Sequence, residues 1–396
     1  MNNNPAKILS LENVLVVLPL TLLIISTFFS VHTEIIAGNI FYLCIACYFG
    51  VSVYRRHPRY ECPTAFMWTF FAYFITLAMS MLWSHSPEQG WIILRRELTW
   101  LGIPIAFCTI HISASNWERI IKIFFRTALL FATVTIIYWL YYITLNNIDI
   151  QLFFIPVKHH IANINCWQIV YGWNSYQHPS YNALGLCLGL ICCWWLLRHR
   201  SISVIEAVVY AILAGLIVYI TQSRIGIVMY AAIVLTCPLL MVWENKKHRL
   251  IYIMVLFLFG IVTLVAWLNI STPFSLDKAR HVLYADAIEG IKAHPILGVG
   301  LGGLPEAINN AKLSNPHNQL LGDWLQSGLP AVCALTVMIL TLLWNALSKR
   351  NGVLLLFIVI SLLFMQIEMP FYLIKGINYF VLFACLFAAK PMASKR

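Results

Sequence analysis

Long apolar runs separated by short polar connections dominate this chain and limit what it can fold into. A membrane-spanning helix needs roughly 20 mostly apolar residues, and reading the sequence for such runs gives about twelve candidates. With 61% hydrophobic and only 10% charged residues, the chain does not have the composition of a soluble globular protein. We therefore predict an all-α, polytopic integral membrane protein. The runs centre near Val17, Leu43, Phe71, Ile105, Ile136, Leu190, Leu213, Val234, Phe257, Val337, Ile358 and Phe383.

Lysine and arginine predict how these helices are oriented, because cytoplasmic loops carry an excess of both. With the N-terminus placed in the cytoplasm, 16 of these residues fall on the inside and 9 on the outside, while Arg126 lies within a helix. We expect both termini to be cytoplasmic and residues 1–396 to form one membrane domain. The polar start of the chain does not resemble a cleavable signal peptide. The net charge of +11 then reflects anchoring at the inner face, so nucleic acid is not an expected partner.

Two longer polar segments, 146–179 and 271–318, interrupt the apolar background on the predicted outer side. The first is rich in aromatic and amide side chains and ends at His178. Flat apolar faces beside amides suit the faces and hydroxyls of sugars, which makes His178 a candidate substrate contact. The alternative is that the tryptophans and tyrosines form the belt that is common at membrane interfaces.

The second segment combines a predicted amphipathic helix, Leu283–Lys292, with a glycine run from Gly298 to Gly303. Gly300 and Gly302 would allow a tight turn in which backbone approaches a ligand. We expect short helices in this large outer loop.

His317 and Asn318 follow, just before a strongly apolar run. Asn318, or the preceding Asn315, could cap the helix that begins there. A neutral imidazole at this place could accept a proton from an alcohol, with its tautomer set by a neighbouring group. The alternative is an interfacial histidine that hydrogen-bonds only to backbone.

Three arginines on the predicted outer side, against the general charge bias, are candidate ligand contacts: Arg224, Arg280 and Arg95. A guanidinium group binds phosphate oxygens through two parallel hydrogen bonds and keeps its charge at any working pH. These residues therefore predict a site for an anionic lipid headgroup. For Arg95 the alternative is an ion pair with Glu88 or Glu97.

Metal chemistry is poorly indicated, because the outer acidic residues are scattered. Asp277, Asp286, Glu289, Glu306 and Asp323 are examples, and no outer motif has paired carboxylates at metal-ligand spacing. We predict a metal-independent site without a soluble cofactor, in which arginines stabilise a leaving diphosphate.

These motifs resemble the O-antigen ligase and polymerase superfamily of bacterial envelope membranes. His317-Asn318, followed by nine residues and Gly328, is similar to the ligases' His-Asn signature. Arg224 resembles the arginine of a Ser-Arg-Gly-like turn, and Arg280 with the stretch from His294 to Gly300 is similar to the family's arginine and Pro-x-x-Gly-x-Gly sequence. Val228 and Ala331 depart from the pattern, and sequence separates ligases from polymerases poorly.

The resemblance implies a glycosyltransferase that uses a polysaccharide donor linked to undecaprenyl diphosphate. In an O-antigen ligase the glycan passes to lipid A-core at the periplasmic face of the inner membrane, without ATP. Mapped onto this sequence, His317 would deprotonate the acceptor hydroxyl, which attacks the anomeric carbon with inversion. Asn318 would orient His317 or the acceptor, and Arg224, Arg280 and Arg95 would bind the diphosphate.

Two alternatives remain open at this point. An O-antigen polymerase would use the same donor with a second lipid-linked glycan as its acceptor. A transporter of lipid-linked glycans belongs to a different class, and it would be expected to carry charged groups near the middle of the membrane. Apart from Arg126 and Glu206, the candidate residues lie at the outer face.

Overall fold

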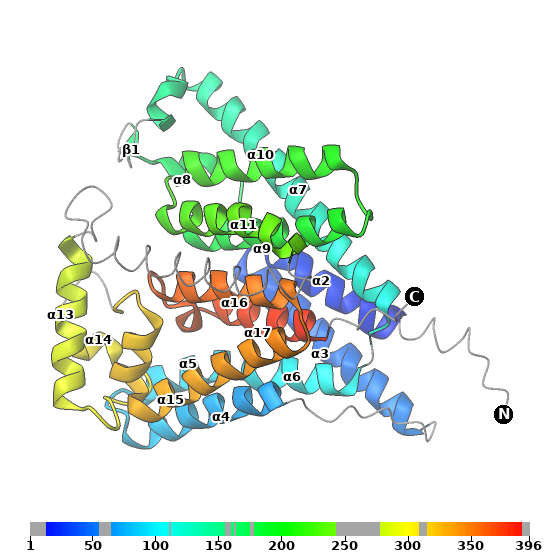
Figure 1. Ribbon diagram of the computed structural model, residues 1–396. Coiled ribbons are helices and arrows are strands. Elements are labelled where there is room, and N and C mark those ends of the chain that lie inside the picture. The colour runs from blue at the N-terminus through cyan, green and yellow to red at the C-terminus, as the bar shows by residue number, and fades with distance from the viewer. Residues whose placement is uncertain are drawn as a thin grey trace.

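The computed structural model describes residues 13–54, 65–110, 112–154, 160–161, 164–174, 178–242, 278–308 and 315–389. These residues are almost entirely helical, which confirms the all-α prediction (Figure 1). The helices are η1 (Asn13–Val17), α2 (Leu18–Ser26), α3 (Val31–Tyr54), α4 (Ala65–Ser80), η2 (Met81–Trp83), α5 (Pro87–Glu97), α6 (Thr99–Thr109), α7 (Ala114–Leu145), η3 (Ile150–Phe154), α8 (Cys166–Val170), α9 (Pro179–Arg198), α10 (Val204–Ile220), α11 (Arg224–Val242), α13 (Lys278–Ala293), α14 (Leu304–Ala307), α15 (Gln319–Ser348), α16 (Gly352–Met365), η4 (Pro370–Tyr372) and α17 (Ile374–Ala388).

Five of the described helices are long and apolar enough to cross a membrane, and five further apolar segments are shorter. Every predicted centre except Phe257 falls within a helix, and Phe257 lies outside the described residues. The short run around Ile105, which contains Pro104, forms α6 with only 11 residues. The chain is a polytopic membrane protein.

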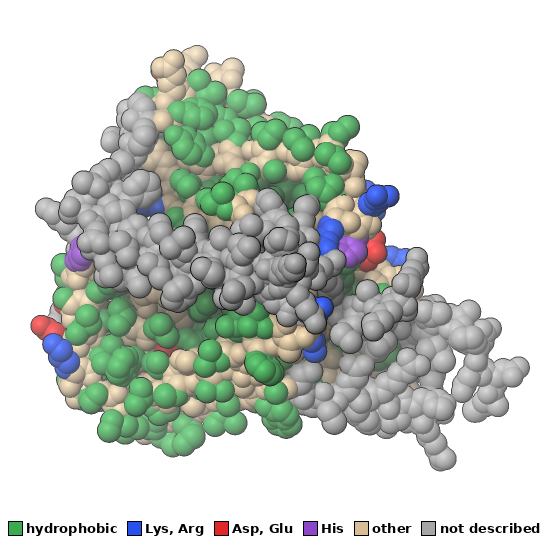
Figure 2. Space-filling view, viewed as in Figure 1, with side chains coloured by type: hydrophobic (Ala, Val, Ile, Leu, Met, Phe, Trp, Pro, Cys, Tyr) green, Lys and Arg blue, Asp and Glu red, His purple; other side chains and the backbone are tan. Residues whose placement is uncertain are grey.

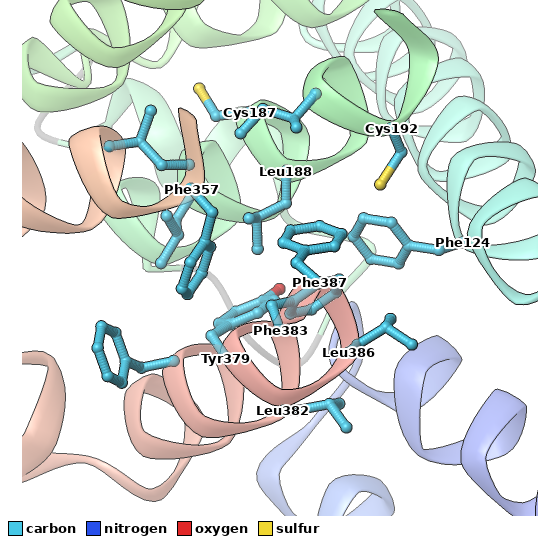
Figure 3. Close-up of a cluster of buried hydrophobic side chains, with 14 of the residues drawn as sticks. Phe124, Cys187, Leu188, Cys192, Phe357, Tyr379, Leu382, Phe383, Leu386 and Phe387 are labelled. Atoms are coloured by element: carbon cyan, nitrogen blue, oxygen red, sulfur yellow. The ribbon is translucent and has the colours of Figure 1, made fainter. Parts of the chain in front are cut away.

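Helix α9 is the centre of the bundle, since 94% of its most apolar 18-residue window is buried. It packs against α7, α10, α11 and α16. Figure 3 shows the core beside it, where Leu188 and Cys192 of α9 face aromatic side chains that include Phe357, Tyr379 and Phe383. Burial of such side chains in a dense interior fixes the positions of the helix ends, which carry the polar groups described below.

The surface is arranged as expected for a protein surrounded by lipid. In Figure 2 hydrophobic side chains cover much of the described face, whereas most of the charged side chains lie toward its two ends. Large apolar side chains such as Leu43, Ile212 and Trp344 are exposed. In water this would be unfavourable, but in a bilayer the hydrocarbon solvates them.

Two groups of short elements elaborate one end of the bundle. Helices α13 and α14 pack against α15, at the left of Figure 1, over a second apolar cluster that includes Leu283, Ala287 and Leu325. The four-residue spacing of Leu283, Ala287 and Ile291 accounts for the predicted amphipathic helix, since it places them on one face. In the earlier segment, η3 and α8 flank a short antiparallel pair, β1 (His160–Ile161) and β2 (Ile164–Asn165), in which His160 pairs with Asn165.

Helix α15 is broken at Gly328, where φ is 74° and ψ is −170°. The break lets the backbone of α15 bond to the connection that follows α13, because Leu329 N donates to Ile296 O at 3.0 Å and Val299 N donates to Leu325 O at 2.9 Å. The first part of α15, which begins beside His317, is thereby tied to the α13 side of the molecule.

Candidate active site

Buried charged side chains gather at one end of the helix bundle. Those of the described residues are Glu34, Glu97, Asp323, Glu368 and Lys375. Each lies near the start or end of its helix, or in a connection, at the end where α3, α9, α15 and α17 begin and α16 ends. Several are joined across the bundle, as when Lys375 Nζ donates to Phe29 O at 2.8 Å. Charge at a bundle end is the placement expected of a surface-acting enzyme, whereas a transporter site is expected near the midplane.

His317 lies at this end, on the turn that leads into α15. Its φ is 48°, an uncommon value for a residue with a side chain, and its N–H donates to Asn315 Oδ1 at 3.0 Å. The side chain is 24% exposed, so the ring is held against protein and still reaches solvent. Asn315 therefore shapes the turn that presents His317, a role that asparagine commonly has beside a left-handed residue.

Of the two asparagines that the sequence offered as caps, Asn318 caps α15. Its Oδ1 accepts from Leu321 N at 3.1 Å, and its Nδ2 donates to Gln366 O at 3.2 Å. The first bond gives a partner to a backbone N–H in the first turn of α15, which has no acceptor within the helix. The second ties the His317 turn to the segment that follows α16.

Glu368 is the direct partner of His317, and the sequence reasoning missed it. His317 Nδ1 lies 3.2 Å from Glu368 Oε2, and Ser180 Oγ donates to Glu368 Oε1 at 2.9 Å. The carboxyl group is buried and joins the start of α9 to the loop before α15. One signal could have identified it: Glu368 is a lone acid between two strongly apolar runs, a place where a charge needs a partner.

The electrostatics of this cluster favour a charged carboxylate. Burial by itself raises the pKa of Glu368, but the hydrogen bond with His317, the charge of Arg280 and the charges that His178 and His317 carry when protonated outweigh it, so the pKa lies below its ordinary value. His178 responds in the opposite sense: burial lowers its pKa, partly offset by the negative charge of Glu368. At neutral pH the cluster therefore holds an ionised Glu368 beside a neutral His178.

His178 immediately precedes α9 and is placed by its neighbour Tyr181. The two rings meet edge to face with their centroids 4.9 Å apart, and Tyr181 Oη donates to Met369 O at 3.3 Å. The start of α9 is thus attached to the same connection, 366–369, that carries Glu368.

Arg280 lies in the first turn of α13 and is half-buried. Its charge acts on both Glu368 and His178, so the structure brings Arg280 into the same cluster as His317. One turn further along α13, Tyr284 Oη donates to Gln366 O at 3.2 Å, which fixes α13 against the connection.

Arg224 begins α11 and is also half-buried. Helix α11 packs against α9, and Gly226 lies close to Ala183 of α9, about one turn beyond His178. Arg224 is therefore at the same end of the bundle as His178. The preceding residue has a structural role: Ser223 Oγ accepts a hydrogen bond from Gly226 N at 3.2 Å and so caps the start of α11.

Arg95 lies on the exposed side of α5, whose buried side carries Ile93 and Glu97. Within the described part of the chain, no ion pair joins Arg95 to Glu88 or Glu97. Glu97 instead accepts from Trp100 Nε1 at 2.5 Å. A role for Arg95 in binding diphosphate stays a prediction.

Gly300 and Gly302 are buried against the backbone that leads from α4 into α5. A Cβ on Gly300 would meet Ser84, and a Cβ on Gly302 would meet Gly90, with φ values of 86° and 96° respectively. Close backbone packing at positive φ accounts for both glycines. Contact between these glycines and substrate stays a prediction.

The described aromatic and amide residues of the 146–179 segment have structural partners. Tyr171 is buried, Trp173 Nε1 donates to Thr135 Oγ1 at 3.2 Å, and Asn174 Nδ2 donates to Phe28 O at 2.8 Å. Asn165 and Gln168 form a capping box at α8. Tyr176 and Gln177 lie outside the described residues.

Together, a partly exposed histidine ring with a carboxylate on Nδ1 and a nearby guanidinium group can remove a proton and stabilise an anion. Such a pairing leaves Nε2 as the basic nitrogen of a neutral imidazole. The geometry suits attack by a hydroxyl on an activated, negatively charged donor.

Comparison with known protein families agrees with this arrangement. Residues 207–336 match the family model described as O-antigen ligase. The matched segment contains Arg224, Arg280, His317, Asn318 and Gly328, whereas Glu368 lies beyond it. No curated protein matched the chain. This match supports the resemblance inferred from the motifs: residues 207–336 of this membrane protein are similar to the O-antigen ligase family.

Proposed function

We propose that this protein is an O-antigen ligase, which transfers polysaccharide from undecaprenyl diphosphate to lipid A-core at the periplasmic face of the bacterial inner membrane. The observation that carries the proposal is His317, held by a buried carboxylate at the bundle end to which Arg280 also contributes its charge. The family of the matched segment acts on lipid-linked polysaccharide, which gives that cluster its substrate class.

The reaction assigns one role to each part of the cluster. His317 Nε2 takes the proton of the acceptor hydroxyl, whose oxygen forms a bond to the anomeric carbon of the donor. The bond from that carbon to the diphosphate oxygen breaks on the opposite face, so the configuration inverts. Arg280 and Arg224 bind the departing diphosphate, with Arg95 as an additional candidate, and no metal or soluble cofactor takes part.

Arg224 supports the proposal through its position at the start of α11. A lipid-linked diphosphate needs cationic groups at the membrane surface, because its two phosphates cannot be solvated within hydrocarbon. Arginines at the ends of α11 and α13 meet that need while the isoprenoid chain stays among apolar helices.

Transfer by purified protein in proteoliposomes tests this function. The donor is undecaprenyl-diphosphate-linked O-polysaccharide, supplied with or without lipid A-core. We expect product on lipid A-core, and a loss of roughly 10²–10⁴-fold in His317→Ala, the usual contribution of a general base. His199→Ala is the matched control, since His199 ends α9 at the opposite end of the bundle and packs on Trp195.

Other outcomes point elsewhere. Longer lipid-linked chains formed without lipid A-core would identify a polymerase. Movement of the donor across the bilayer without any transfer would identify a transporter. Full transfer by His317→Ala would remove His317 from the mechanism.

A further inference from the structure

The connection between α16 and η4 carries an acid whose burial needs an explanation. Glu368 is 6% exposed, in the sequence Gln366-Ile-Glu-Met-Pro370, with apolar helices on both sides. A buried carboxylate is costly unless its oxygens are hydrogen-bonded. Both oxygens are satisfied by residues distant in sequence, Ser180 and His317. The acid therefore joins two separate parts of the chain through one side chain.

The contact specifies which ring nitrogen of His317 carries a hydrogen. An ionised carboxylate only accepts hydrogen bonds, so Nδ1 of a neutral His317 must be the donor to Glu368 Oε2. Nε2 then bears the lone pair. The positive charge of Arg280 and the hydrogen bond itself keep the pKa of Glu368 low against the effect of burial, which maintains the acceptor at neutral pH.

Hydrogen bonds to the backbone around the pair hold the two segments against each other. Asn318 Nδ2 and Tyr284 Oη both donate to Gln366 O, two residues before Glu368. The His317 turn is itself fixed by Asn315, and its positive φ gives the ring a direction that a regular helix start would not. A buried carboxylate needs only hydrogen bonds to its oxygens, and these further contacts are not required for that. They are the kind of support that holds the ring of His317 in one orientation.

We infer that Glu368 is a positioning residue for the proposed transfer: it fixes His317 in the tautomer that exposes a basic Nε2, and Ser180 holds Glu368 in place. The inference rests on the proposed function of His317. When Nε2 takes the proton of the acceptor, the ring becomes a cation and Glu368 stabilises it without accepting a proton. The proton leaves later from Nε2, so Glu368 ends the cycle as it began.

The key variant is Glu368→Gln, which keeps the size of the side chain but replaces the carboxylate by an amide. An amide N–H facing Nδ1 would favour hydrogen on Nε2, the unreactive tautomer. We expect kcat to fall by roughly 10²–10⁴-fold with the donor KM nearly unchanged, since a buried carboxylate that orients a histidine has effects of this order. Glu368→Asp keeps the charge and should recover part of the loss. Glu289→Gln, the same change at an exposed site on α13, is the matched control.

A pH profile separates positioning from a merely structural role. Loss of the negative charge makes the protonated ring less favourable, so the acid limb of kcat in Glu368→Gln should move to lower pH. The neighbouring groups are His178 and Arg280, which act on Glu368, Tyr284, on which Glu368 acts, and Lys375, which acts on His178, and all are unchanged in the variant. Glu368→Asp should restore the limb toward its original position.

The tautomer can be read without activity. In protein labelled with ¹⁵N-histidine, with the His317 signal identified by its loss in His317→Asn, we expect hydrogen on Nδ1 above neutral pH and on Nε2 in Glu368→Gln. Hydrogen on Nε2 in the unmodified protein would overturn the inference. The inference would also be overturned if Glu368→Gln had a normal kcat and an unchanged acid limb while His317→Ala was inactive. In that case the proposed function stands. If His317→Ala transfers normally, the catalytic role proposed for His317 fails, and with it the role assigned to Glu368. If the Glu368→Gln protein does not fold, Ser180→Ala is the deciding variant. We then expect a smaller fall in kcat and a shift of the acid limb of kcat in the same direction.

Discussion

Asn318 and Asn351 form a natural pair for separating stability from catalysis. Each caps a helix with its Oδ1 and donates from Nδ2 to a backbone carbonyl of another segment, Asn318 at the start of α15 and Asn351 at the start of α16. Loss of such a cap costs about 1 kcal/mol. We expect Asn318→Ala and Asn351→Ala to lower the unfolding temperature in detergent similarly. Only Asn318→Ala should also reduce transfer per folded molecule, because only Asn318 fixes the His317 turn. Equal specific activities would contradict this role for Asn318.

Single residues also show where sequence reasoning succeeds and where it stops. The cap at Asn318 was predictable, because a cap depends on residues three positions apart along the chain. Glu368 was not found, because its partner lies 51 residues away and no local pattern encodes that contact. Its isolation between apolar runs indicates that a partner exists, but the identity of the partner depends on how the helices pack.

At the scale of elements, the break in α15 predicts that adding a single methyl group at Gly328 lowers both stability and transfer. Gly328 adopts φ 74° and ψ −170°, a region that residues with side chains avoid at a cost of about 1–3 kcal/mol. A Cβ there would also meet the backbone of Ile296 and Leu297. Gly328→Ala should therefore lower the unfolding temperature and weaken transfer by displacing α13, which carries Arg280. Gly50→Ala is the control, since Gly50 lies in α3 with open space where its Cβ would lie, and it should gain up to about 1 kcal/mol. A Gly328→Ala protein as stable as the parent would contradict this account.

The helices themselves were predictable because apolar length alone identifies a span. The elements that depend on packing were not. Helix α6 is shorter than a span, and within the run from Gly298 to Gly303, which suggested a ligand turn, Gly300 packs against Ser84 and Gly302 against Gly90. A glycine run in a sequence indicates close backbone approach, but it does not say whether the approaching group is a ligand or the chain itself.

At the scale of the whole molecule, the fold arranges the candidate groups by which end of the bundle they occupy. Arg224, His178 and His317 come from different helices, yet each lies where its helix starts, as does Arg280 on α13. Arg126 and Glu206, the two charges that a midplane site would have used, instead pair with each other at 3.4 Å, with side chains 58% and 32% exposed. The function therefore depends on which side of the membrane the end that holds His317 faces.

The charge bias of 16 inside to 9 outside predicts that this end faces the periplasm. Glu289→Cys, on exposed α13, and Ser348→Cys, at the far end of α15, place a thiol at opposite ends of the bundle. In spheroplasts treated with a membrane-impermeant maleimide, we expect Glu289→Cys to be labelled above the unmodified chain. Ser348→Cys should react only after the membrane is opened with detergent. The reverse pattern would place His317 on the cytoplasmic side. Transfer at the periplasmic face would then be impossible, and the proposed ligase function would fail.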